Sequence, residues 1–254
     1  MQAQKRIIGV SVFVACLGVA LIVSSLATNH WISSTPGFLN ETNKSQSANI
    51  SFGLFAGYKS IDFGLGVRPH VLEIACDLPE QACAFVDSHG QLNTLIQDYH
   101  NQTGEGGKSM EWFGLFSFPA YVATLVMLNL AIVCGFLAVG FGFFNVFGRP
   151  IETITGPSGL YVWNILSFVF ATAAFGTFLG LYFSQLKVNI LIPEELSHFT
   201  SGDHTDLDYS FYFVVGAAAS FILNLVILSL SGQKCSCHYS LTGKKEVDSG
   251  MILY

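Results

Sequence analysis

The sequence predicts an all-α membrane protein, in which a four-transmembrane-helix bundle carries a small extracellular β-rich first loop and keeps both termini in the cytoplasm. Of the 254 residues, 51% are hydrophobic and 11% are charged, with a mean hydropathy of +0.52, whereas soluble domains are about one quarter charged. Each of four apolar stretches is long enough to cross roughly 30 Å of hydrocarbon; they are residues 7–27, 119–143, 160–186 and 209–230. All glycosylation acceptors fall between the first two stretches.

The first apolar stretch, 7–27, follows a basic start at Lys5 and Arg6. A cleavable signal peptide is the alternative interpretation, because residues 25–27 have the small side chains of a cleavage site. The apolar run is longer than the usual signal core, which favours a retained helix. In both cases the chain after Ala27 is expected outside the cell.

Orientation follows from glycosylation acceptors and from charge. A single Asn-X-Ser/Thr acceptor is a weak signal, but four in one segment predict an extracellular, glycosylated loop; they are Asn40, Asn43, Asn49 and Asn101. The opposite side holds six of the eleven basic residues but only three of the seventeen acidic ones. The positive-inside rule therefore also places both termini in the cytoplasm.

The large loop, 28–118, is expected to contain a small sheet. "ISFGLFAGY" at 50–58 has the aromatic and β-branched content of a strand, and a second strand is expected within 61–76. "NQTGEGGKS" at 101–109 is typical of a flexible return to the membrane. Cys76 and Cys83 lie in this loop, where an oxidising compartment favours a disulfide between them, with two free thiols as the alternative.

The membrane stretches carry no Asp, Glu, Lys, Arg or His at their centres, which argues against a transporter or an intramembrane enzyme. Their strongest polar groups, Asn129 and Asn224, are expected to form hydrogen bonds between helices. Small residues at four-residue spacing predict close helix packing within the bundle, with a contact between copies of the protein as the alternative; the pairs are Ala138 with Gly142, Gly176 with Gly180, and Gly216 with Ser220. Cys16 and Cys134 are expected to be packing residues.

The loop 144–159 contains Gly156-Pro157-Ser158-Gly159, which superficially suggests a phosphate-binding or catalytic turn. The phosphate-binding fingerprint with its lysine is not present, and the nucleophile-elbow pattern fails by one position. We therefore interpret the loop as a cytoplasmic hairpin between two membrane helices. We predict a protein that is not an enzyme and has no cofactor and no catalytic or metal site.

Two further regions, one outer loop and the cytoplasmic tail, remain to be interpreted. The outer loop 187–208 is short and acidic, and Pro193 marks a helix start within it. Its "DHTDLD" stretch lacks the glycine and closing glutamate of a calcium loop, which favours a solvated acidic surface. In the cytoplasmic tail, Cys235 and Cys237 lie close to the membrane and are candidates for palmitoylation, with unmodified thiols as the alternative.

The chain ends in "MILY", whose Ile252, Leu253 and Tyr254 have the pattern of a C-terminal ligand that adds as a strand to a PDZ-type scaffold. The alternative is a short apolar tail that nothing binds. In the complete predicted layout, the cytoplasmic parts are 1–6, 144–159 and 231–254, and the extracellular loops are 28–118 and 187–208. The membrane helices between them are 7–27, 119–143, 160–186 and 209–230.

The stretch "FNVFGRPIETITGPSGLYVWN" at 144–164 resembles the loop between the second and third helices of the clarin family. Trp31, "FGLFAG" at 52–57, "FGLGVRP" at 63–69 and the terminal "MILY" resemble clarins as well, in the same order along the chain. No clarin subtype is assigned.

The resemblance implies a plasma-membrane organiser that links the cell surface to a cytoplasmic scaffold and to actin-rich projections or synapses of sensory cells. The expected partners are the lipid bilayer, a scaffold protein and neighbouring membrane proteins, with neither nucleic acid nor a small-molecule substrate. Clarins are in turn similar to claudins, so the alternative is a claudin-like junction protein that forms a paracellular barrier or cation path. Three glycosylation acceptors between Trp31 and Gly53 argue against this alternative, because glycans there would obstruct a sealed junction.

Overall fold

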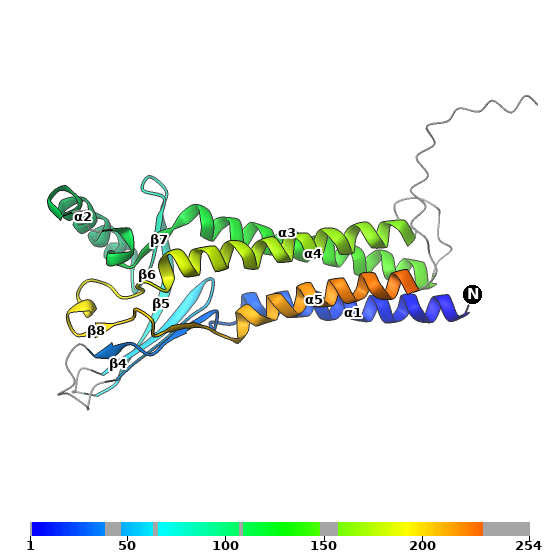
Figure 1. Ribbon diagram of the computed structural model, residues 1–254, viewed down its shortest axis with the longest axis horizontal. Coiled ribbons are helices and arrows are strands. Elements are labelled where there is room, and N and C mark those ends of the chain that lie inside the picture. The colour runs from blue at the N-terminus through cyan, green and yellow to red at the C-terminus, as the bar shows by residue number, and fades with distance from the viewer. Residues whose placement is uncertain (1, 39–46, 63–65, 107–108, 148–156, 231–254) are drawn as a thin grey trace, which may run out of the picture.

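The computed structural model describes residues 2–38, 47–62, 66–106, 109–147 and 157–230. Four long helices lie side by side, and a β-rich end is attached to one end of the bundle (Figure 1). The helices are α1 (Gln2–Ala27), α3 (Phe118–Phe147), α4 (Pro157–Leu181, continued by the π-helical turn Tyr182–Leu186) and α5 (Tyr209–Leu230). Each is long and apolar enough to cross a membrane, in agreement with the predicted four-helix membrane fold.

The helices form a closed bundle in which α1 packs against α3 and α5, and α4 packs against the same two neighbours. Gly135 and Gly142 of α3 face α1, where an added side chain would collide with Val19 and Val12 respectively. Close packing at the Ala138–Gly142 pair is therefore confirmed, since both residues are buried.

The same expectation is wrong for Gly176 and Gly180. Both are exposed on α4, and a side chain added at either would meet open space. Small residues at four-residue spacing are common in membrane helices on every face. The spacing alone therefore did not reveal which face of α4 meets the bundle.

One antiparallel sheet of seven strands forms most of the β-rich end, in the order β7-β6-β5-β4-β3-β1-β9. Its strands are β1 (Ile32–Ser34), β3 (Ser47–Phe52), β4 (Ala56–Asp62), β5 (Arg68–Asp77), β6 (Ala82–Val86), β7 (Leu115–Ser117) and β9 (Thr205–Leu207). The last strand comes from the segment between α4 and α5, and it pairs with β1. A separate pair joins β2 (Gly37–Phe38) to β8 (Phe199–Thr200). The predicted sheet within the first loop is thus larger than expected and includes one strand, β9, from the second loop.

The stretch 50–58 was expected to be one strand, but the chain turns at 53–55, so that β3 and β4 form a hairpin. Helix α2 (His89–Gly106) also corrects the sequence analysis, since residues 101–106 belong to it rather than to a flexible return. Leu92, Leu95 and Ile96 lie on one face of α2 and are buried with strand residues such as Ala84. The sequence signal was this helical spacing, which the polar residues around it obscured.

Trp31 joins the sheet to the bundle. Its side chain is fully buried, its indole nitrogen donates to the Ser25 carbonyl at 2.8 Å, and its ring lies edge-on to Phe178 at 4.6 Å. The backbone of the same residue donates to the Phe52 carbonyl and accepts from the amide of Asp208. One residue therefore contacts α1, α4, β3 and the start of α5.

Candidate functional site: a charged cleft on the β-rich end

A cleft of about 350 Å³ opens between the sheet and the segment that follows α4. One wall consists of residues on β4, β5 and β6 together with the start of α2, and the other is the turn around η3 (Glu195–Ser197). We call this site the charged cleft, after the ionisable side chains that line it: Lys59, Arg68, His70, Asp87, Glu194, Glu195 and His198.

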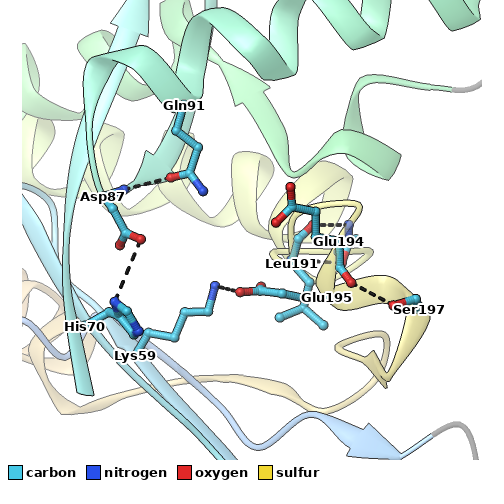
Figure 2. Close-up of polar contacts among 9 residues, drawn as sticks. Lys59, His70, Asp87, Gln91, Leu191, Glu194, Glu195 and Ser197 are labelled. Atoms are coloured by element: carbon cyan, nitrogen blue, oxygen red, sulfur yellow. Dashed lines mark hydrogen bonds and ion pairs between the residues drawn. The ribbon is translucent and has the colours of Figure 1, made fainter. Parts of the chain in front are cut away.

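Lys59 and Glu195 form an ion pair across the cleft (Figure 2). Lys59 lies on the face of β4 that also buries Gly57 and Ile61, so that its side chain points toward the second loop rather than into solvent. Both residues are nearly buried, at 9% and 8% exposed. Two charges removed from water in this way stabilise each other only as a pair, because either one alone would be costly to bury.

Glu195 has one oxygen that the pair does not use. Its second carboxylate oxygen, Oε2, is buried and has no hydrogen-bond partner among the described residues. This oxygen is therefore an unsatisfied acceptor that the fold encloses beside the ion pair.

Next to the pair lies a more exposed polar contact between Asp87 and His70. The Asp87 carboxylate is 3.9 Å from Nδ1 of His70, and both side chains are about half exposed. The backbone amide of Asp87 donates to Oε1 of Gln91 at 2.9 Å, which ties β6 to the start of α2 (Figure 2). This part of the cleft therefore offers solvated polar groups beside the buried pair.

The second wall is held in place by Asn189, a residue that the sequence analysis did not single out. Its Nδ2 donates to the Leu191 carbonyl at 2.8 Å and to the Glu111 carbonyl at 3.0 Å. Its Oδ1 accepts from the Leu191 amide at 2.9 Å and from the Ser201 hydroxyl at 2.8 Å. With its amide fully used, Asn189 fixes the loop that carries Glu195.

The predicted modification sites lie away from the cleft or outside the described residues. Asn49 on β3 and Asn101 on α2 are both exposed. Cys76 and Cys83 face each other on β5 and β6 and are joined by a disulfide. Outside the described residues lie Asn40, Asn43, Cys235, Cys237 and residues 252–254.

The two membrane asparagines differ. Asn224 is buried and donates to Oδ1 of Asn164 on α4 at 2.6 Å, so its predicted role between helices is confirmed. Asn129 is exposed on α3 and donates to the Leu125 carbonyl of its own helix at 2.8 Å. The expectation that Asn129 links helices of the bundle is wrong.

These features define a multi-pass membrane protein whose four helices contact the lipid bilayer and whose two loops at one end fold into a single β-rich unit. The family model described as Clarin-2-like matches residues 116–228. Among known proteins, rat Clarin-3 is 27% identical over 84% of this chain and 80% of its own length, and human Clarin-1 is 26% identical over 90% and 89%. Mouse Clarin-2 is 24% identical over 83% and 81%. The resemblance to the clarin family is therefore confirmed, and the matches assign no subtype.

Proposed function

We propose that this protein is a non-enzymatic organiser of the plasma membrane, with the β-rich end outside the cell and both termini in the cytoplasm. The ends of α1 and α5 that lead to the two termini lie together, opposite the β-rich end (Figure 1). Asn49 and Asn101, two of the glycosylation acceptors, are exposed on the β-rich end. The excess of basic residues near the termini supports the same orientation.

The charged cleft is the proposed contact site for a neighbouring protein outside the cell. The observation that carries the proposal is a cleft of about 350 Å³ whose walls come from both loops, held together by the Lys59–Glu195 pair. Beside this pair, Arg68, Asp87 and Glu194 line the cleft and are exposed. A polar segment of a partner protein with basic or amide side chains has donors for the exposed Asp87 and Glu194 carboxylates. The proposed ligand of the cleft is thus a polar protein segment.

On the cytoplasmic side, the proposed role of residues 252–254 is to bind a PDZ-type scaffold and thereby to place the protein in actin-rich projections, as in sensory cells. The support is the terminal sequence pattern and the clarin resemblance. Palmitoylation of Cys235 and Cys237 is proposed to hold the tail against the inner leaflet.

The experiment is quantitative imaging of the protein in a polarised epithelium, with and without residues 251–254. We expect enrichment in actin-rich protrusions that falls when these residues are removed. Deletion of residues 240–243 is the matched control, because it shortens the tail equally but keeps its end. A junctional belt that is indifferent to the tail would overturn the proposal and favour the claudin-like alternative.

A further inference from the structure

The lipid-facing side of α3 carries a polar side chain that the bundle does not use. Asn129 is the one amide side chain in the exposed class within the described parts of the four spans. It lies about 16 Å along the helix from Phe118, at 1.5 Å per residue, which is roughly the middle of a 30 Å hydrocarbon layer. Lipid tails offer an amide neither donors nor acceptors.

The hydrogen-bond capacity of Asn129 is only partly used. Its Nδ2 donates once, to the Leu125 carbonyl. An asparagine amide has a second N–H donor and an oxygen with two acceptor sites. Because one amide both donates and accepts, two copies of Asn129 can satisfy each other.

The residues around Asn129 form a continuous seam. Exposed residues follow one another at alternating steps of three and four along α3: Val126, Asn129, Val133, Phe136, Gly140 and Phe143. This average spacing of 3.5 residues keeps one stripe of a helix against a parallel neighbour, and a single asparagine in such a stripe sets the register. A side chain added at Gly140 would meet open space, so the seam also has one position at which a second backbone can approach closely.

We propose that α3 is the self-association face of this protein, on which a second copy packs its own α3 in parallel around Asn129. Two copies inserted in the same orientation are related by a two-fold axis along the membrane normal, so each seam residue meets its own counterpart at the same depth. Asn129 then meets Asn129, and Gly140 meets Gly140. A different partner helix would need its own polar group at this depth, whereas a second copy supplies one by symmetry.

The exposed face of α4, in its described part, shares the open glycines but lacks the amide. Its open glycines, Gly176 and Gly180, lie among apolar residues such as Val169, and the described part of that face exposes no amide. This face therefore provides a matched control surface on the same molecule.

The first test measures energy transfer between donor-labelled and acceptor-labelled full-length chains in phosphatidylcholine vesicles, over a range of protein-to-lipid ratios. We expect wild type to associate, and Asn129→Leu to weaken association roughly threefold to tenfold, the range for hydrogen bonds between membrane helices. Asn129→Gln keeps the amide and is expected to retain association. A wild type that stays monomeric at every ratio, or Asn129→Leu chains that associate like wild type, would overturn the proposal.

The second test locates the contact by disulfide trapping. The background retains Cys76 and Cys83 and has serine in place of Cys16, Cys134, Cys235 and Cys237; one new cysteine is then introduced as Val133→Cys on α3 or Val169→Cys on α4. Oxidation is expected to trap the α3 variant as a dimer several times faster than the α4 variant. Equal rates, or faster trapping through α4, would overturn the proposal that α3 is the self-association face.

Discussion

The β-rich end and the helix bundle are held together by different kinds of contact. In the β-rich end, residues far apart in the sequence meet through directed interactions: β1 with β9, Lys59 with Glu195, and the Asn189 amide with the Glu111 carbonyl. In the bundle, close packing around Gly135 and Gly142 dominates, and Asn164 with Asn224 is a buried polar pair. The β-rich end should therefore be sensitive to the loss of single partners, and the bundle to changes of volume.

The largest effect is expected where the two regions join. Trp31→Ala removes a fully buried ring and its hydrogen bond to Ser25, which should lower the free energy of unfolding by about 3–5 kcal/mol. Chemical denaturation in detergent micelles measures this quantity. Phe183→Ala is the control, because this residue is 59% exposed; equal losses in both variants would contradict the central position of Trp31.

The buried ion pair is the next test of the β-rich end. Lys59→Met should cost about 3–5 kcal/mol of unfolding free energy, because it leaves the Glu195 carboxylate buried without a cation. The double variant Lys59→Met and Glu195→Leu should recover most of the loss. Asp87→Asn, which breaks the half-exposed contact with His70, is expected to change stability by less than about 1 kcal/mol. If Lys59→Met were as mild as Asp87→Asn, the pair would contribute no more than a surface contact.

The asparagine pair is the corresponding test of the bundle. Asn224→Leu should lower the free energy of unfolding by about 1 kcal/mol, the typical value of a polar contact between membrane helices. The loss is smaller than for the ion pair because no isolated charge remains. Steric trapping in lipid vesicles measures this loss of unfolding free energy. A double-mutant cycle with Asn164→Leu separates the interaction energy of the two asparagines from the cost of each single substitution.

The smallest effect on folding is expected at Asn129. Asn129→Leu should leave the free energy of unfolding of the monomer within about 0.5 kcal/mol of wild type, because its hydrogen bond stays within α3 and its side chain is exposed. The same assay as for Asn224 applies, at protein concentrations below association. A loss as large as that of Asn224→Leu would mean that Asn129 supports the bundle itself.

Much of the bundle was predictable because every part of a membrane-spanning helix has to suit the same apolar hydrocarbon layer. Apolar runs long enough for the hydrocarbon identified the four membrane helices. The directions of individual side chains were not predictable in the same way. Asn129 and Asn224 look alike in the sequence, and only the packing of the helices decides that one faces lipid and the other faces Asn164.

The charged cleft was not predictable. Lys59 lies in a short strand with ordinary alternation, and Glu195 follows a proline in a loop, so that neither residue stands out among the other charges. Their meeting depends on β9 pairing with β1 and on Asn189 anchoring the loop. None of these long-range contacts leaves a local pattern in the sequence.

The sequence by itself determined that the chain crosses a membrane with four helices and resembles clarins, because length, apolarity and short motifs are local properties. The tertiary structure alone decided that the two loops share one sheet, that Lys59 meets Glu195, and that Asn129 faces outward. Backbone groups at strand edges need hydrogen-bond partners, and buried charges need partners of opposite charge. Which residues serve as partners depends on the whole fold rather than on the neighbouring residues in the sequence.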